Sequence, residues 1–263
     1  MSTPPPSQNA ARITQLVSMV QQGQWALAET LLGRLLSEQP HEPDGLQLLG
    51  LVRAHQGRTA EAETLYRRSL ALRPRQPNVQ INLSLLLLGA GRAQEAVALL
   101  RSAVRADPNN PDLYLALGQL QHFVGDTAFA ERNLTTVLKL RPNDPSAVLS
   151  LSGILNLSER APQSEALLRQ TLEQNAAPEM RAALEHNLAV ALKVQRRYDE
   201  ALPLFDSALA RSPNLPSAQA NRASTLQHLD RREDAIEGFR GALRRDPLHL
   251  AAHQELNALL YRM

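Results

Sequence analysis

The chain has 263 residues, of which 43% are hydrophobic, 3% aromatic and 21% charged, and its formal net charge is +2. This near-neutral balance argues against the basic footprint that nucleic-acid binding requires. The absence of cysteine excludes disulfides, thiolate metal sites and cysteine nucleophiles.

Residues 1–8 are rich in proline and polar side chains, so they are predicted to form a disordered tail. The N-terminal segment has no charged start followed by an apolar stretch, and no apolar run approaches the length of a membrane span. We therefore expect a cytoplasmic protein that does not contact a membrane. The abundance of Ala, Leu and Arg indicates a bacterial gene of high GC content.

From residue 9 onward, the sequence repeats with a period of 34 residues. Prolines recur at 40, 74, 108 and 142, and again at 213 and 247. Within each repeat, positions 8 and 20 are mostly small, position 24 is large, and position 15 is glycine in the first four repeats. Two apolar stripes of helical spacing flank position 15, so each repeat is predicted to be two antiparallel helices. The proline at position 32 ends the second helix.

The predicted repeat units are 9–42, 43–76, 77–110, 111–144, 145–178, 182–215 and 216–248. Three extra residues separate the fifth and sixth units, within QNAAPEMRAALEHNL, and predict a local irregularity. Residues 249–263 are predicted to form a C-terminal capping helix. Because one helix pair cannot bury its apolar faces alone, stacked pairs are needed, and the fold class is all-α, an α-α superhelical solenoid.

These residues resemble the tetratricopeptide repeat family over about residues 9–248. The resemblance implies a concave groove lined by the first helix of each pair. In that frame the groove floor is mostly apolar in the first five repeats. Asparagine recurs at position 6, where relatives hold extended peptides by their backbone. The candidate groove residues are Leu51, Ile81, Asn82, Leu85, Leu115, Leu149, Asn187 and Asn221. Partial burial between repeats explains the apolar positions equally well.

No catalytic, cofactor-binding or metal-binding constellation emerges from the sequence. His249 and His253 have the spacing of two metal ligands, with Glu255 beyond them, but no third ligand is evident, so they are interpreted as surface histidines. The family's two-carboxylate clamp for chaperone C-termini needs lysine and asparagine at positions that differ here. No cofactor is expected.

The leading hypothesis is a non-enzymatic scaffold that binds a peptide or protein segment in the groove. The segment AHQELNALLYR resembles the junction before appended catalytic domains, so the first alternative is a substrate-recruiting module of a larger enzyme: an oxygenase, sulfotransferase or glycosyltransferase. The second alternative is a homo-oligomerisation module. RNA-reading pentatricopeptide repeats fit poorly, because position 5 is mostly apolar here.

Overall fold

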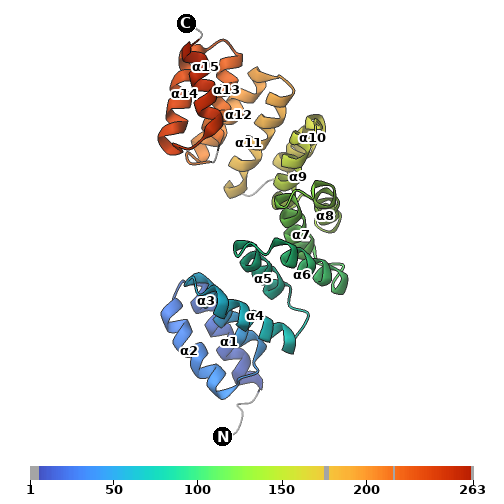
Figure 1. Ribbon diagram of the computed structural model, residues 1–263. Coiled ribbons are helices and arrows are strands. Elements are labelled where there is room, and N and C mark those ends of the chain that lie inside the picture. Colours follow the sequence, from blue (N-terminus) through green and yellow to red (C-terminus); the bar gives the residue numbers. More distant parts are fainter. Residues whose placement is uncertain (1–5, 175–177, 216, 262–263) are drawn as a thin grey trace. The chain divides into compact units, whose positions relative to one another are not determined.

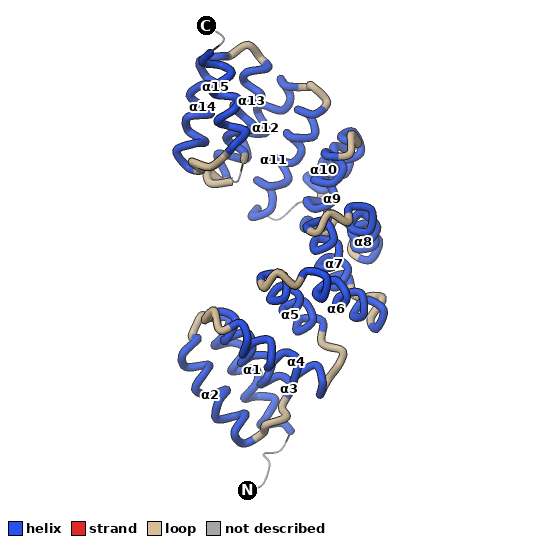
Figure 2. The backbone as a smooth tube through the Cα atoms, viewed as in Figure 1, coloured by secondary structure: helices blue, strands red, loops and turns tan. Residues whose placement is uncertain are grey.

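A computed structural model describes residues 6–174, 178–215 and 217–261, which form fifteen helices and no strand (Figures 1 and 2). The predicted all-α repeat fold is confirmed. We name the first helix of each pair the A helix and the second the B helix. The helices are α1 (Pro6–Gln21), α2 (Trp25–Glu38), α3 (Pro43–His55), α4 (Thr59–Leu72), α5 (Pro77–Gly89), α6 (Ala93–Ala106), α7 (Pro111–Phe123), α8 (Thr127–Leu140), α9 (Pro145–Leu157), α10 (Ala161–Glu173), α11 (Pro178–Val194), α12 (Tyr198–Arg211), α13 (Ala218–His228), α14 (Arg232–Arg245) and α15 (Leu250–Tyr261).

Proline marks both ends of a repeat. The prolines at 40, 74, 108, 142, 213 and 247 each stand two residues beyond the end of a B helix. A second proline, at 43, 77, 111 or 145, is the first residue of the A helix that follows. Proline suits that first position because its missing N–H would have no helical partner there and its φ is already helical.

Small residues bring the two helices of a pair together. A Cβ added to Gly50 of α3 would lie only 2.7 Å from Cε1 of Tyr66 in α4. In the seventh pair, a Cβ added to Gly238 of α14 would lie 2.8 Å from the Cβ of Ala223 in α13. The large residue at position 24 then fills the space beside these close approaches, and Tyr66 and Phe205 are both fully buried.

The turn inside each pair has one residue in the left-handed region of backbone conformation. Glycine takes this place in the first four pairs, with φ between 73° and 84°, at Gly23, Gly57, Gly91 and Gly125. The last three pairs lack glycine, yet Glu159, Arg196 and Asp230 have φ values of 57°, 61° and 56°. The turn geometry therefore persists where the residue that favours it has been lost.

Replacing Arg196 with glycine is expected to raise the free energy of unfolding by about 1 kcal/mol, because relief of left-handed strain exceeds the added freedom of the unfolded chain. The side chain of Arg196 is exposed. Urea denaturation would measure the change. Arg196→Ala is the matched control, since alanine removes the side chain and keeps the strain. A glycine variant no more stable than the alanine variant would contradict the prediction.

The chain divides into two compact units, residues 1–126 and 127–263. The first unit has one apolar cluster on α1–α3, around Leu32, and another on α4–α7, around Tyr66. The second unit has one cluster on α9–α12, around Phe205, and another on α13–α15, around Phe239. The division falls in the turn between α7 and α8, not at the insertion between the fifth and sixth repeats.

The three extra residues, together with Pro178 before them, lengthen a helix. α11 has 17 residues, whereas α3, α5, α7 and α9 each have 13. The added turn lies at the N-terminal end of α11, where Met180 packs against the cluster around Phe205. Residues 175–177 of the predicted irregularity lie outside the described residues. So do residues 1–5 of the predicted tail, and α1 begins within that tail, at Pro6.

Arginine at position 16 joins successive repeats within each unit. In the first unit, Arg92 Nη1 lies 2.8 Å from Oε2 of Glu63 on the preceding B helix. In the second, Arg197 Nη1 lies 2.6 Å from Oε2 of Glu165. Each arginine also pairs with a glutamate of its own repeat. Such partly exposed pairs contribute less than about 1 kcal/mol each, so they supplement the apolar clusters.

Candidate functional site

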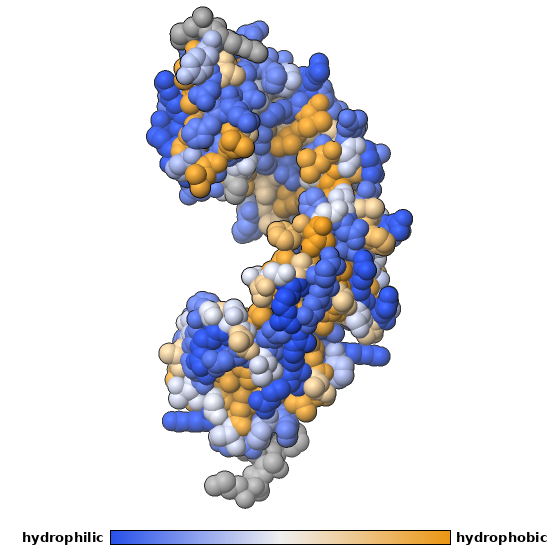
Figure 3. All heavy atoms as spheres, viewed as in Figure 1, coloured by the Kyte–Doolittle hydropathy of each residue, from blue (hydrophilic) through white to orange (hydrophobic). Residues whose placement is uncertain are grey.

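All eight candidate groove residues lie on A helices, but they divide between the two units. On the face drawn in Figure 3, apolar side chains are exposed in patches over both units. The first unit holds Leu51, Ile81, Asn82, Leu85 and Leu115, and the second holds Leu149, Asn187 and Asn221.

The first unit has an open hollow of about 380 Å³ between α3, α4 and α5. It brings together three of the predicted residues, Leu51, Asn82 and Leu85, of which Leu85 is 60% exposed. No charged side chain lines it. The complete lining is Leu51, Ala54, Thr59, Tyr66, Asn82, Leu85, Leu86, Gly89 and Ala90. A surface of this kind suits an uncharged, largely apolar group.

Ile81 and Leu115 do not line this hollow. Both are half-buried, and Ile81 packs against the cluster around Tyr66. Ile81 therefore contributes to the apolar cluster on α4–α7.

Polar groups meet at one side of the hollow. The side chain of Asn82 hydrogen-bonds the hydroxyl of Tyr66, across the α4–α5 boundary. Burial raises the pKa of Tyr66 to about 12, although the hydrogen bond from Asn82 acts in the opposite direction. The tyrosine is therefore neutral at physiological pH, and its ring and hydroxyl hold Asn82 at the edge of an apolar surface.

The hollow exists partly because Gly89, the last residue of α5, has no side chain. A Cβ added there would have no atom within 4 Å. The equivalent position 13 carries larger side chains in most other repeats, namely His55, Phe123, Leu157, Val194 and His228. The sequence prediction missed Gly89 and treated Tyr66 only as a packing residue. The glycine at position 13 was the available signal.

The two candidate asparagines of the second unit form hydrogen bonds to neighbouring A helices. Asn187 of α11 donates from Nδ2 to the carbonyl oxygen of Leu149 at 3.2 Å and to Oγ of Ser152 at 2.9 Å, both on α9. Asn221 of α13 accepts at Oδ1 from Nζ of Lys193, at 3.0 Å. Asn187 therefore joins two A helices, and Asn221 orients a lysine that the sequence prediction did not single out.

His186, at position 5 of α11, lies next to the core of the second unit. Its ring meets Phe205 edge-on, with centroids 5.6 Å apart. Its Nδ1 is buried and has no hydrogen-bond partner among the described residues. Burial, and secondarily the nearby Lys193 ammonium, lower the pKa of His186 to about 4, so the ring is neutral near pH 7.

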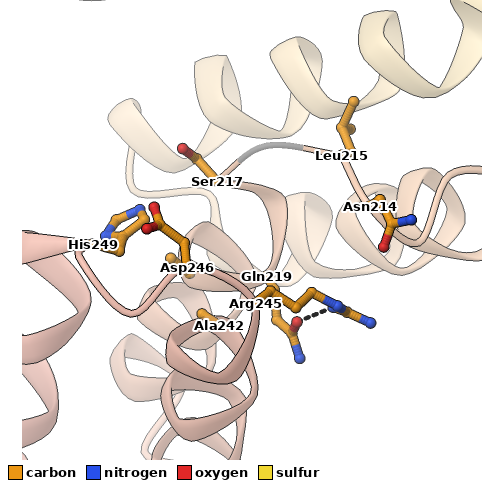
Figure 4. A pocket seen from close by; sticks show the side chains of 9 residues that line it. Asn214, Leu215, Ser217, Gln219, Ala242, Arg245, Asp246 and His249 are labelled. Carbon is orange, nitrogen blue, oxygen red and sulfur yellow. Dashed lines mark hydrogen bonds between the residues drawn. The ribbon is translucent and has the colours of Figure 1, made fainter.

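A smaller hollow of about 220 Å³ lies near the C-terminal end, where α13 and α14 meet their connecting turns (Figure 4). Its main polar groups are engaged in local structure. Arg245 donates to the side-chain oxygen of Gln219, Asp246 accepts from the amide of Leu248, and His249 Nδ1 accepts from the amide of Ala252. These three side chains thus bond to the protein itself, and Arg245 joins α14 to α13.

In the part of the chain that the structure describes, no three His, Asp or Glu side chains gather closely enough to hold a metal ion. None of the described helices has both the length and the apolar character that crossing a membrane requires.

Comparison with sequence families gives two matches, both described as tetratricopeptide repeat. One family model matches residues 18–77 and 158–216, and the other matches residues 77–120. Together they cover more than half of the chain. Among curated proteins, the TPR repeat-containing thioredoxin TTL4 of Arabidopsis thaliana is 41% identical over 66 residues. That stretch is 25% of this chain and 10% of the plant protein.

Several solved structures share the fold. A chain of the APC/C hetero-tetramer Cut9-Hcn1 superposes with a TM-score of 0.76 at 19% identity, covering 93% of this chain and 48% of that one. A tetratricopeptide repeat protein from Parabacteroides merdae gives 0.70 at 16% identity, covering 95% and 98%. YrrB, described as having an unusual peptide-binding site, gives 0.54 at 19% identity, covering 72% and 96%. The chain thus spans about half the length of the Cut9-Hcn1 chain that it matches.

Proposed function

The chain belongs to the tetratricopeptide repeat family, and from that premise we propose that it is a scaffold that binds a peptide or protein segment on its A helices. The observation that carries the proposal is the uncharged hollow of the first unit, lined by Leu51, Asn82 and Leu85. It has the exposed apolar surface that an apolar side chain could cover, and Asn82 offers amide hydrogen-bonding groups beside it. YrrB, which shares the fold, is described as peptide-binding.

The proposal assigns the first unit a specific contact. An aliphatic or aromatic side chain of the segment occupies the space left by Gly89, against Leu85 and the edge of Tyr66. Ile81, Leu115 and Leu149 contribute as half-buried apolar surface of their A helices. No catalytic step is assigned to these 263 residues.

Leu85→Asp is expected to weaken binding of a partner recovered by pull-down at least tenfold, about 1.4 kcal/mol, because it places a charge on the apolar contact surface. Gly89→Leu should weaken it similarly by filling the hollow, and it leaves Leu85 in place. Isothermal titration would measure both, after circular dichroism has shown unchanged helicity.

Leu27→Asp is the matched control, since Leu27 is 50% exposed and lies on the B helix α2 of the first unit, outside the proposed A-helix surface. It should leave affinity unchanged. If Leu85→Asp and Gly89→Leu remain folded and bind as tightly as the parent chain, the contact surface lies elsewhere.

A second candidate function is a recruiting module of a larger enzyme. The observation that favours it is the match to a short stretch of a plant thioredoxin that carries TPR repeats. The test is the mass of the native polypeptide, by immunoblot and mass spectrometry of cell extract. A mass well above 29.0 kDa would support this function, and a mass equal to it would refute it.

A further inference from the structure

The hollow near the C-terminal end of the second unit exists because its repeat departs from the others in two places. α13 has 11 residues and begins at Ala218, the third position of its repeat, whereas α3, α5, α7 and α9 have 13 residues and begin at the first position. At position 5, Ala220 stands where every other repeat has a larger side chain, namely Ile13, Gln47, Ile81, Leu115, Leu149 and His186. A later helix start and a small side chain leave about 220 Å³ between α13, α14 and the turns beside them.

Part of the lining of this hollow is aliphatic. Leu215, Ala220 and Ala242 line it, and the two alanines are buried. Gln219 lies against the backbone of α14, because a Cβ added to Gly241 would be only 2.3 Å from its Nε2. The glutamine therefore forms one wall of the hollow without filling it, and the alanines leave space for a short hydrocarbon chain.

Arg245 and Asp246 bring opposite charges to the lining, and neither forms an ion pair within the described residues. Arg245 donates from Nη1 to Oε1 of Gln219, which leaves its Nε–H and Nη2 donors. Asp246 accepts at Oδ1 from the amide of Leu248 at 3.2 Å, which leaves Oδ2. In Figure 4 the Asp246 carboxylate lies beside the His249 ring, and the Arg245 guanidinium extends in the other direction. The hollow therefore has an anionic side and a cationic side.

These two charges define the kind of ligand that fits. An ion of one sign would be attracted to one side of the hollow and repelled by the other. Arg244, the preceding residue of α14, is paired with Glu237 at 2.9 Å and so adds no net charge. A molecule with one ammonium and one carboxylate matches both sides, because a guanidinium can bind a carboxylate through two N–H groups and Asp246 can accept from the ammonium. The volume of the hollow is below the roughly 300–1,000 Å³ of pockets for drug-sized ligands, so the ligand is small.

We propose that this hollow binds a small free amino acid. The carboxylate of the ligand accepts from Arg245, its ammonium donates to Oδ2 of Asp246, and its hydrocarbon chain packs against Ala220 and Ala242. The site lies in the second unit, whereas the proposed peptide contact lies in the first, so the inference adds a small-molecule ligand to the scaffold function. The two charged groups of the ligand are separated by a single carbon in an α-amino acid and by several carbons in an ω-amino acid.

Four soluble compounds test the charge requirement without a peptide partner. L-leucine and γ-aminobutyrate carry both charges at different spacings, L-leucinamide carries only the ammonium, and N-acetyl-L-leucine carries only the carboxylate. In the ¹⁵N-labelled full chain, NMR follows the backbone amides of Ala220 and His249 at the hollow. The amide of Leu85 in the first unit is the internal control.

We expect the Ala220 and His249 amides to shift saturably with at least one of the two zwitterions, with a Kd of about 1 mM or tighter, and the Leu85 amide to stay in place. The zwitterion that saturates identifies the spacing of the charges in the ligand. Each single-charge compound should bind at least tenfold more weakly. A single-charge compound that binds as tightly as the zwitterions, or no saturable shift with either zwitterion, would overturn the site.

Four variants, each checked for helicity by circular dichroism, locate the binding. Arg245→Gln and Asp246→Asn each remove one charge and should weaken binding of the zwitterion at least tenfold, while Arg244→Gln, the matched control on α14, should leave it unchanged. Ala220→Leu supplies the residue of the fourth and fifth repeats and should abolish the shifts by filling the hollow. If Ala220→Leu remains folded and binds as tightly as the parent chain, the ligand lies elsewhere and the proposal is wrong. The scaffold function, which is tested at Leu85, does not depend on this result.

Discussion

Replacing Phe205 with alanine is expected to lower the free energy of unfolding of the second unit by about 3–5 kcal/mol, the range measured for deleting a buried aromatic side chain. Phe205 is fully buried in the cluster on α9–α12. Repeat arrays are stabilised mainly by contacts between neighbouring repeats, so the loss should concentrate in the repeats that touch this residue. Hydrogen exchange, read along the chain, measures where protection falls.

Tyr66→Ala is the matched variant, because Tyr66 fills the equivalent position of the second repeat and is also fully buried. We expect Phe205→Ala to reduce protection of amides in the second unit and Tyr66→Ala to reduce it in the first. Equal loss of protection across both units in either variant would show that the chain unfolds as one cooperative body.

Acidification is expected to destabilise the second unit through His186. Its pKa is lowered from 6.5 to about 4 in the folded chain, so the unfolded chain binds the proton more readily between these values. Stability is therefore full above about pH 6.5 and falls as the pH approaches 4, by at most about 3 kcal/mol at 1.36 kcal/mol per pKa unit. Urea denaturation at successive pH values measures this loss.

His186→Leu separates the histidine from the acidic groups. Salt-bridged carboxylates such as Glu165 also lose stabilising interactions in acid, but they remain in the variant. The slope of stability against pH between 6.5 and 4 should therefore be smaller in His186→Leu than in the parent chain. Identical slopes would mean that the imidazole is not buried in the folded state.

The helical repeat was predictable because each repeat carries the same kinds of residue at the same packing positions. Small residues such as Gly50 and Ala62 mark where two helices cross, and Tyr66 fills the adjoining space. Proline and glycine mark helix ends through their own backbone restrictions. These signals are local, so the 34-residue period was enough to predict seven helix pairs and a final helix.

The candidate site was only partly predictable, because side-chain partners come from neighbouring helices. Helical position alone placed Leu51, Asn82 and Leu85 on A helices, and the structure brings these three together. It could not show that Asn187 donates to a carbonyl of α9. Nor could it show that Lys193 of α11 donates to Asn221 of α13.

Position 4 of the sixth repeat is another place where the sequence did not predict the environment of a side chain. Glu185 is buried there, 2.8 Å from Oγ of Ser207 and 3.3 Å from Nε of Arg211. No other repeat has a carboxylate at this position, so the repeat pattern gave no reason to expect a buried one. Two of its partners lie on α12, more than twenty residues further along the chain, and the third, Arg181, lies one turn earlier on α11.

The long α11 also bears on how such arrays change in evolution. Each residue turns an α-helix by about 100°, so three residues inserted in mid-helix would rotate everything beyond them by about 300° and turn packed side chains toward solvent. Placed before the packed stretch, the same three residues only add a turn, and the stretch from Leu184 to Leu192 remains buried against its neighbours. Insertions and deletions should therefore be tolerated at the starts of A helices and eliminated by selection at their centres. Related genes can then differ in length at the helix starts while the contacts further along the chain are conserved.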